Sequence, residues 1–440
     1  MKTHSPFCLL GFVVTCFMLF PSCEKQTQIR PNIVFLLADD LGYNELGSYG
    51  QKIIKTPHLD KLAKQSMRFT DFYAGNSVCS PSRAVLLTGV SSAYVPIRGN
   101  AGYFGKDDWS PTWLESNTFT FGELFKSAGY QSAFVGKWHL DNPDDISTWA
   151  CSHSFDFAAQ EQWTHRKSIR NFSKGGIWLN GDQKHFPYDF NNHECKDAFY
   201  TNFAIDFLDN KESDKPFFLF MSYRAPHSFE GPIRDTLDYV KRDWPKVEQA
   251  QAAKITLQDK QVGRLLDYLE SIGEMDNTIV MYTSDNGAHF GADGKGHQLE
   301  FFDSNGNLKG GKRDLYEGGV RVPLLAYWKN NIIPGSVTSH VSAFQDLMPT
   351  FAEIIGLKKP KQSDGISFLP LLLGKVQEKH EYLNWEFQLS GWFQALPDGG
   401  FRQSVRLGKW KGVRYGITVS YTHLRAHETR GNLVCRLLLE

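Results

Sequence analysis

Residues 32–40 read Asn-Ile-Val-Phe-Leu-Leu-Ala-Asp-Asp, an apolar run that ends in two adjacent carboxylates, Asp39 and Asp40. A short apolar run without polar alternation is typical of a buried strand. Comparable runs recur along the chain, and we expect strands at Ser132–Val135, Phe217–Met221, Thr278–Tyr282 and Leu324–Trp328.

Segments with helical periodicity lie between these apolar runs. The leucine and valine residues of Val262–Leu269 follow the i, i+3, i+4, i+7 spacing of an amphipathic helix. Leu59–Met67 and Phe119–Ala128 are also expected to be helical, and Gly129 and Gly273 stand where helix C-terminal glycines belong. Alternation of strands and helices predicts an α/β fold, with a large, mostly parallel sheet sandwiched by helices.

The pattern changes after Gly374. Tyr382–Phe387 and Val405–Tyr415 have the composition of strands, with no helical segment between them. This indicates a catalytic α/β domain over residues 24–374 and a small antiparallel C-terminal subdomain over residues 375–418. We expect the subdomain to be truncated, because the unusual tail, residues 419–440, follows its last expected strand almost at once.

The last residues of the chain have a sequence that does not look like part of the native protein. Ser420–Thr429 resembles the translation of a common transposase-library sequencing adapter, and Leu433–Leu439 resembles the flanking adapter in the same reading frame. The alternative is a native basic tail, which a match on both sides of an index-length gap disfavours. We therefore predict that residues 419–440 are an assembly artefact that replaces the true C-terminus.

The N-terminus has the features of an export signal. Lys2 and His4 precede the apolar run Phe7–Phe20, which is too short for a comfortable membrane span. A small residue before Cys23 resembles a bacterial lipoprotein cleavage site, and simple signal-peptidase cleavage is the alternative. We expect residues 1–23 to be a signal peptide of an exported protein. Its location would be periplasmic or outer-membrane-anchored in a Gram-negative bacterium, with Cys23 as the only possible membrane anchor.

Composition excludes some classes of protein. The chain has 440 residues, 48 basic and 48 acidic, and a formal net charge of zero. Such a balance argues against a broad nucleic-acid-binding surface, so no nucleic-acid partner is expected. Aromatic residues make up 14% of the chain, and exposed members of this group would suit stacking on sugar rings.

Cysteine usage singles out one residue. The signal segment, the possible lipidation site and the adapter-like tail hold four of the seven cysteines, Cys8, Cys16, Cys23 and Cys435. Of the rest, Cys151 and Cys195 could pair in an oxidising compartment, which the sequence leaves open. Cys79 would then be the one cysteine of these three without a disulfide partner.

Polar residues cluster where the expected strands end. Asp39 and Asp40 close the first strand, and Asp285 and Asn286 follow Thr278–Tyr282 closely. In an α/β fold such positions meet at the carboxyl edge of the sheet. Three carboxylates and an amide oxygen are hard ligands that suit Ca²⁺ or Mg²⁺, although each motif alone could be an ordinary turn.

Two further clusters carry reactive or charged groups. In Cys79-Ser-Pro-Ser-Arg, Pro81 fits the first turn of a helix, which places Cys79 at the positive helix end, with Arg83 facing the same way. A buried structural cysteine is the alternative. In Gly-Lys-Trp-His, Lys137 and His139 would share one face of an extended segment.

These motifs together resemble the type I, formylglycine-dependent sulfatases of the alkaline phosphatase superfamily. The Cys-Ser-Pro-Ser-Arg segment is similar to the sulfatase signature, and the segment Tyr316–Pro323 resembles a further family motif. The similarity spans roughly residues 31–415, in the family's order. Ten positions match, namely Asp39, Asp40, Cys79, Arg83, Lys137, His139, His227, Asp285, Asn286 and Lys312.

The resemblance implies a cofactor and a modified residue. A maturation enzyme would oxidise Cys79 to 3-oxoalanine (formylglycine), whose hydrate attacks sulfur. One Ca²⁺, with Mg²⁺ less expected, would be bound by Asp39, Asp40, modified Cys79, Asp285 and Asn286.

The resemblance also implies roles for the remaining residues. Arg83, Lys137 and Lys312 would neutralise the sulfate. His227 would protonate the leaving alcohol, and His139 would take a proton from the second hydroxyl of the diol, which expels sulfate.

The expected reaction is the hydrolysis of sulfate esters, on sulfated carbohydrates. Ring identity and sulfate position depend on loops such as Trp163–His193. One alternative is a phosphodiesterase or phosphonate hydrolase of the same superfamily. Another is a non-catalytic glycan-binding lipoprotein with the same fold.

Overall fold

The computed structural model describes residue 1 and residues 30–103, 109–161, 176–181, 185–228, 233, 236–291, 296–389, 400–415 and 424–426. The chain divides into two compact units, Met1–Arg30 and Pro31–Glu440, and all elements below belong to the second. The predicted signal segment and Cys23 lie outside the described residues. In the described part of the chain, no helix combines the length and apolar character that a bilayer crossing requires.

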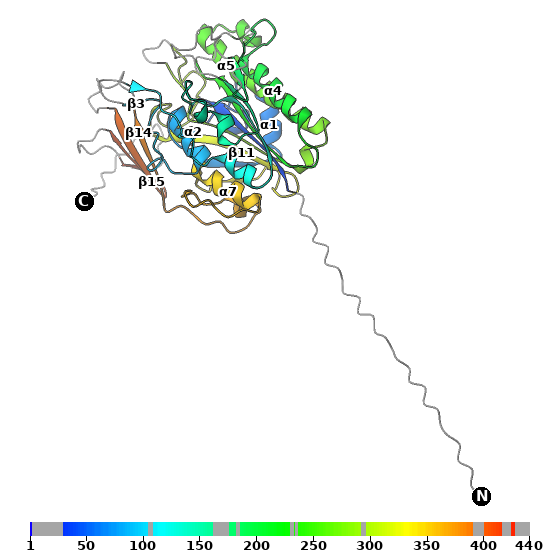
Figure 1. Ribbon diagram of the computed structural model, residues 1–440. Helices are drawn as coiled ribbons and strands as arrows, with labels where there is room; N and C mark the ends of the chain where they lie inside the picture. The colour runs from blue at the N-terminus through cyan, green and yellow to red at the C-terminus, as the bar shows by residue number, and fades with distance from the viewer. Residues whose placement is uncertain are drawn as a thin grey trace. The chain divides into compact units, whose positions relative to one another are not determined.

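A large mixed sheet forms the centre of the unit Pro31–Glu440 (Figure 1). The strand order is β12-β2-β11-β10-β1-β9-β5-β6-β7-β8, and β13 pairs with β2. Strands β6, β5, β9, β1 and β10 are parallel neighbours, whereas β11 is antiparallel to both β10 and β2. The strands are β1 (Asn32–Asp39), β2 (Met67–Tyr73), β5 (Gln131–Lys137), β6 (Phe157–Glu161), β7 (Ile177–Leu179), β8 (His185–Phe186), β9 (Phe217–Pro226), β10 (Thr278–Ser284), β11 (Arg321–Trp328), β12 (Val337–Thr338) and β13 (Ser342–Ala343).

Strand β1 is buried along its whole length. It pairs in parallel with β9, where Ile33 faces Phe218, and with β10, where Asn32 faces Thr278. Because successive side chains of a strand point to opposite faces of the sheet, those of β1 lie alternately in two separate apolar cores. The expected α/β fold with a mostly parallel sheet between helices is confirmed.

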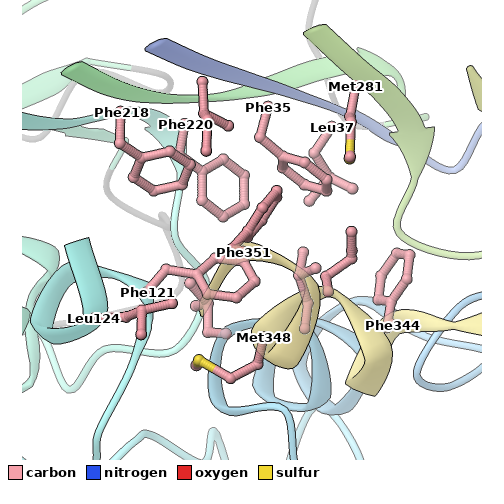
Figure 2. Packing of buried hydrophobic residues seen from close by; sticks show 14 of the residues in the cluster. Phe35, Leu37, Phe121, Leu124, Phe218, Phe220, Met281, Phe344, Met348 and Phe351 are labelled. Carbon is pink, nitrogen blue, oxygen red and sulfur yellow. The ribbon is translucent and has the colours of Figure 1, made fainter. Parts of the chain in front are cut away.

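One face of the sheet packs on α2 (Cys79–Thr88), α3 (Phe121–Ser127), α7 (Leu347–Ile354) and α8 (Leu369–Leu372). Phenylalanines dominate this core (Figure 2). Phe35 meets Phe220 edge-on, with ring centroids 5.2 Å apart, and Phe351 of α7 lies 6.1 Å from Phe35. Aromatic pairs of this geometry add to the stabilisation that burial itself provides.

The opposite face packs on α1 (Pro57–Ala63), α4 (Lys196–Asn210) and α5 (Lys246–Ser271). Val262, Leu265 and Leu269 of α5 are buried there, as their spacing predicts. The short remaining elements of this unit are β3 (Gly102–Tyr103), β4 (Trp109–Ser110), α6 (Glu317–Val320) and the 3-10 helices Gly47–Tyr49, Ile146–Thr148, Ala150–His153, Leu237–Lys241, Met275–Asn277 and Phe344–Asp346.

A second, antiparallel sheet has the order β14 (Tyr382–Gln388), β15 (Phe401–Leu407), β16 (Trp410–Tyr415) and β17 (Leu424–Ala426). The expected antiparallel C-terminal sheet is thus present. Strand β17 pairs with β16 and lies inside the tail that we predict to be adapter-derived. The domain boundaries and the origin of residues 419–440 remain predictions.

Two expected elements have different limits in the structure. The helix expected at Leu59–Met67 ends at Ala63, and Met67 opens strand β2, which the sequence analysis did not predict. The strand expected at Val405–Tyr415 is the hairpin of β15 and β16, which turns at Gly408 with a φ of +55°. Glycine adopts such a φ without steric penalty, so this residue permits the tight turn.

The cysteines in the described part of the chain do not form disulfides. None of Cys79, Cys151 and Cys195 is in a disulfide with another described residue. The possible pairing of Cys151 with Cys195 is therefore not present in this structure.

Candidate active site

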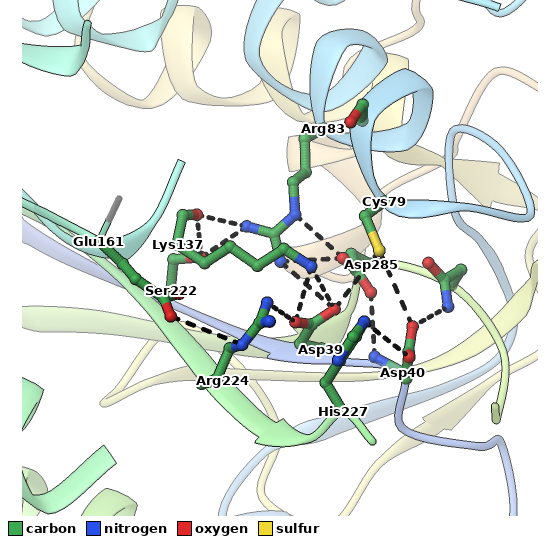
Figure 3. A network of polar contacts seen from close by, with 12 residues as sticks. Asp39, Asp40, Cys79, Arg83, Lys137, Glu161, Ser222, Arg224, His227 and Asp285 are labelled. Atoms are coloured by element: carbon green, nitrogen blue, oxygen red, sulfur yellow. Dashed lines mark hydrogen bonds and ion pairs between the residues drawn. The ribbon is translucent and has the colours of Figure 1, made fainter. Parts of the chain in front are cut away.

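Charged residues gather at the carboxyl edge of the central sheet (Figure 3). Asp39 is the last residue of β1, Lys137 is the last of β5, and His227 follows β9 directly. Asp285 comes directly after β10. Cys79 is the first residue of α2, and Figure 3 shows its side chain directed at the same cluster. Parallel strand pairing thus brings together residues that are far apart in the chain.

Asp39 is surrounded by cations. Its Oδ2 atom lies 2.7 Å from Lys137 Nζ and 3.1 Å from Arg224 Nη1, and its Oδ1 lies 3.9 Å from Arg83 Nη2. Burial by itself raises the pKa of Asp39, but the charges of Lys137 and Arg224 outweigh it and hold that pKa well below its usual range. Asp39 is therefore an ionised carboxylate.

Asp40 follows the end of β1 and has a φ of +71°, in the left-handed region. Its carboxylate accepts a hydrogen bond from Lys312 Nζ at 2.7 Å and another from Asn286 Nδ2 at 2.8 Å. His227 Nε2 lies 3.6 Å from Asp40 Oδ2. Asp40 thus links the ends of β1, β9 and β10 to the loop that carries Lys312.

Asp285 joins the third strand end to helix α2. Its Oδ2 accepts hydrogen bonds from Arg83 Nε at 3.0 Å and Nη2 at 2.8 Å, and its Oδ1 accepts one from the Asp40 backbone N–H at 3.1 Å. Burial, followed by the negative charge of Asp39, raises the pKa of Asp285 to about 6. A cation placed between these carboxylates would relieve their repulsion.

Cys79 stands where α2 begins. Pro81 lies in the first turn of the helix, where the absent N–H of proline leaves no hydrogen bond unmade. The thiol is almost fully buried, and its Sγ lies 3.5 Å from Asp39 Oδ1 and 3.4 Å from Lys312 Nζ. Burial raises the pKa of Cys79 to about 12, although Lys137 and Lys312 oppose the shift. The thiol is therefore protonated at neutral pH.

The cluster offers ligands of the kind that a hard divalent cation takes. One ligand atom from each of Asp39, Asp40, Cys79 and His227 lies within 4.8 Å of the others. Asn286 Oδ1 is buried and makes no hydrogen bond, and a half-turn of this amide exchanges its oxygen and nitrogen. Carboxylate and amide oxygens suit Ca²⁺ or Mg²⁺, so the residues present fit the expected metal.

Both predicted catalytic histidines lie in the site region as neutral imidazoles. Burial, reinforced by Lys312 and Arg224, lowers the pKa of His227 well below its usual value. Burial and the charge of Lys137 do the same for His139. The argument that Lys137 and His139 share a face of an extended segment was wrong, because β5 ends at Lys137 and His139 has a φ of +61°.

Arg83 is held by protein atoms on several sides. Besides Asp285, its Nη1 donates to the backbone oxygen of Lys137 at 2.5 Å and to Ser222 Oγ at 2.7 Å. The guanidinium therefore joins α2 to the ends of β5, β9 and β10. This geometry gives Arg83 a bracing position in addition to its positive charge.

Four residues of the site region were not found by the sequence analysis. Arg224 of β9 contacts Asp39, and its Nε lies 3.7 Å from Glu161 Oε1 at the end of β6. Ser222 binds Arg83, and the ring of His289 lies 6.3 Å from that of His227. A charged residue at the end of an apolar strand, as in Met-Ser-Tyr-Arg, is a signal that could have identified Arg224.

The loop that carries Lys312 is tied to neighbouring segments through its backbone. Lys312 N donates to Ala288 O at 2.9 Å, and Arg313 N donates to Ser77 O at 2.9 Å. At Gly319, a Cβ atom would stand 1.9 Å from Asp314 O, so only glycine permits this close approach. All ten predicted site residues thus lie in or beside one region, and their catalytic roles remain predictions. The loop Trp163–His193 lies partly outside the described residues.

Comparison with protein families gives two matches. The family model described as Sulfatase matches residues 31–357. The model described as N-sulphoglucosamine sulphohydrolase, C-terminal, matches residues 310–419. The first match alone includes most of the chain and all ten site positions.

Curated relatives carry the same family name. The N-acetylgalactosamine-6-sulfatase of Mus musculus is 32% identical over 373 residues, which cover 79% of this chain and 68% of that protein. The Escherichia coli K12 protein named "Uncharacterized sulfatase YdeN" is 31% identical over 420 residues, which cover 86% of this chain and 72% of that protein. The chain thus spans about two thirds of the length of the mammalian relative.

Solved structures share the fold. Ps i-CgsB in complex with k-i-k-neocarrahexaose superposes with a TM-score of 0.74 at 25% identity, covering 92% of this chain and 88% of that chain. A protein in complex with its substrate D-glucosamine-2-N,6-O-disulfate has a TM-score of 0.69 at 22% identity, covering 90% and 91%. The fold, the extent of the family match and the identity with curated relatives agree. The chain therefore belongs to the sulfatase family, the sulfuric ester hydrolases of the alkaline phosphatase superfamily.

Proposed function

We propose that this protein hydrolyses sulfate esters of carbohydrates through a formylglycine made from Cys79, with one bound Ca²⁺. The observation that carries the proposal is the position of Cys79. Its Sγ stands at the first residue of a helix, 3.5 Å from Asp39 and 3.4 Å from the cation Lys312. A nucleophile at this point lies beside carboxylates that can bind the metal ion and also beside a positive charge. Attack on a sulfate group needs both, because the metal ion activates the nucleophile and the cation stabilises the negative charge of the sulfate.

Ca²⁺, when bound, supplies a Lewis acid that polarises a sulfate oxygen and favours deprotonation of the nucleophile. Asp39, Asp40, Asp285 and Asn286 would hold it, together with the modified Cys79. The formylglycine supplies a hydrated aldehyde with two hydroxyl groups. A raised thiol pKa supports the need for this modification, since a protonated thiol is a poor nucleophile.

The basic residues bind and orient the anionic sulfate. Lys137 and Lys312 are buried beside Asp39 and Asp40, so their charges are little screened by water. The N-terminal end of α2 adds a favourable dipole. Arg83 braces Asp285 and adds to the positive field around Cys79.

The two histidines would move protons. His227 would donate a proton to the leaving alcohol oxygen, and the negative charge of bound sulfate would raise the pKa of its neutral imidazole toward that role. Burial lowers the pKa of His139 and keeps its imidazole neutral, and a neutral imidazole has a ring nitrogen that can accept a proton. These assignments follow the family resemblance, the contact of His227 with Asp40 and the closeness of His139 to Lys137.

The known activities in the names of the relatives support a carbohydrate substrate. One curated relative is an N-acetylgalactosamine-6-sulfatase, and solved neighbours contain a carrahexaose and a glucosamine disulfate. We propose a sulfated sugar for this chain as well. An export signal with possible lipidation at Cys23, and a separate maturation enzyme that acts on Cys79, complete the proposal.

Mass spectrometry and a substrate panel test this function. The protein is co-expressed with a formylglycine-generating enzyme, and the Cys79 peptide is analysed for conversion of thiol to aldehyde. The matured protein is then assayed on sulfated mono- and oligosaccharides and on matched aryl sulfate, aryl phosphate and aryl phosphonate esters. We expect turnover of sulfate esters only after conversion. Preference for phosphate or phosphonate esters would favour the phosphonate hydrolase alternative, and no turnover by fully converted protein would favour a binding protein.

A further inference from the structure

The C-terminal sheet contacts the two segments that carry Cys79 and Lys312. One apolar cluster includes Val78, which precedes Cys79, and Leu315, three residues after Lys312. The same cluster contains Trp385 and Phe387 of β14 and Val413 of β16. The C-terminal sheet therefore shares one core with both catalytic segments.

Hydrogen bonds connect the sheet to the segment that precedes Cys79. The Trp385 indole N–H donates to Ala74 O at 2.9 Å, and Asn76 Nδ2 donates to Glu386 O at 2.6 Å. Trp385 is buried, so its bond is not exposed to competing water. These contacts fix the chain that leads into α2.

Basic residues of β15 and β16 connect the sheet to the Lys312 loop. Arg402 Nη1 donates to the backbone oxygen of Arg313, the residue after Lys312, at 2.7 Å. Lys411 Nζ lies 3.0 Å from Glu317 Oε1, and both side chains are buried. The Arg402 guanidinium also stacks on the Tyr415 ring, 4.7 Å from its centroid, which restricts its rotation.

The contacts of the C-terminal sheet with the Cys79 segment and with the Lys312 loop both influence the distance between Lys312 and Cys79. Lys312 Nζ lies 3.4 Å from Cys79 Sγ, and the two segments meet directly where Arg313 N donates to Ser77 O. A displacement of about 1 Å in a catalytic group can lower a rate by about 100-fold. Among its described residues, the loop has no α-helix or strand between β10 and α6, so contacts with neighbouring segments contribute to holding it.

We infer that Arg402 and Lys411 are positioning residues, which hold Lys312 against the nucleophile at Cys79 from a different sheet. The inference rests on the proposed function, because it assigns a purpose to the Lys312–Cys79 contact. Neither residue touches substrate in this assignment. Their effect on turnover passes through Lys312.

Kinetics of single variants give the first test. Arg402→Ala should lower kcat/KM for an aryl sulfate about 10-fold or more, because Lys312 would no longer be held beside Cys79, where it contacts the sulfate. Arg402→Lys keeps a donor and a charge and should restore part of the loss. Lys409→Ala removes an exposed lysine from the turn of the same hairpin and should behave like wild type.

A double-mutant cycle gives the decisive test. In a Lys312→Ala background, Arg402→Ala should change kcat/KM by less than about 3-fold, because the group that it positions is gone. Equal effects of Arg402→Ala in both backgrounds would overturn the inference and show a general structural role. Thermal unfolding and the mass of the Cys79 peptide are measured for every variant, so that loss of folding or of maturation is identified.

The outcome separates this inference from the proposed function. If Cys79→Ala is inactive, Lys312→Ala is strongly impaired but still measurable, and Arg402→Ala equals wild type, only the positioning inference fails. If Cys79→Ala retains activity, the proposed function itself fails. Lys411→Met provides a second variant, and if it does not fold, the Arg402 pair carries the test alone.

Discussion

Lys312 Nζ lies 3.4 Å from Cys79 Sγ although 233 residues separate them in the chain. The same Nζ donates to Asp40 at 2.7 Å. One buried cation therefore contacts both the candidate nucleophile and a candidate metal ligand. Because this cation, the nucleophile and the carboxylate come from three separate segments, changes to each can be interpreted independently.

Replacement of Cys79 should remove activity without loss of the fold. Cys79→Ala should reduce turnover of an aryl sulfate by at least about 1,000-fold, since an alanine side chain has no group that can act as the nucleophile. Its melting temperature should stay within a few degrees of wild type. Protein made without a maturation enzyme should be nearly inactive as well. Equal activity with and without maturation would rule out the formylglycine assignment.

Metal ligands should be needed for both binding and turnover. Asp40→Ala and Asp285→Ala should lose Ca²⁺ and activity together, because each removes a hard oxygen ligand. Elemental analysis and calcium titration measure the metal, and a chelator should inactivate wild type until Ca²⁺ is restored. Asp276→Ala, at an exposed carboxylate, is the matched control. Two zinc ions per chain would instead support a phosphatase-like site.

The leaving group should decide how much His227 matters. His227→Ala should slow hydrolysis of alkyl and sugar sulfates far more than that of activated aryl sulfates, which need little protonation. The measurement is the dependence of kcat on leaving-group pKa. His289→Ala removes the neighbouring imidazole and should leave this slope unchanged. A uniform loss across leaving groups would assign the acid to another residue.

Stability should depend on pH through Glu317. Burial alone raises the pKa of Glu317, but Lys411 and Arg321 hold it well below its usual value. The folded-state pKa is below the unfolded value of about 4.3, so the carboxylate stabilises the fold above that pH and loses this effect as the pH falls. Glu317→Gln should lower the free energy of unfolding by about 3 kcal/mol at pH 7, because it leaves Lys411 buried without its charge partner.

Denaturant unfolding from pH 7 to pH 3 measures this difference between wild type and Glu317→Gln. The gap should shrink as the pH falls below about 4. Glu212→Gln changes an exposed ion pair and should show no such trend. A gap that stays constant with pH would mean that packing, and not charge, connects Glu317 to the C-terminal sheet.

The tail gives a genomic prediction. Long reads through the locus should show the reading frame diverging near Thr418, with a different sequence in place of residues 419–440. A chain completed from that sequence should be more soluble and more stable, since added elements would cover the C-terminal sheet. A genome that encodes Ser420–Glu440 as written would contradict the artefact interpretation.

Apolar runs made the central strands predictable, because burial on both faces of the sheet leaves Ile33–Ala38 of β1 and Phe217–Met221 of β9 without a polar residue. Site positions at those ends followed from the family motifs. Strand β2 was missed, since Met67–Tyr73 mixes buried and half-buried residues and follows a helical segment directly.

Other features depend on tertiary contacts that a sequence does not display. The role of Arg224 in the site depends on its ion pairs with Asp39 and Glu161, which belong to other strands. His139 has a positive φ where the chain leaves β5. Histidine does not require this conformation, so the residue type alone could not predict it. The attachment of Arg402 to the Lys312 loop likewise needs the assembled sheet.

Strand β1 constrains the order in which this protein folds. The Asn32 side chain binds Phe217 N, 185 residues later, and Asp40 N binds Asp285, 245 residues later. During synthesis β1 therefore emerges long before either of its neighbours. An apolar segment with two unpaired edges favours aggregation, and pairing across such separations is slow. The catalytic centre therefore cannot assemble until the second half of the chain has been synthesised, because Asp40 and Asp285 both belong to that centre.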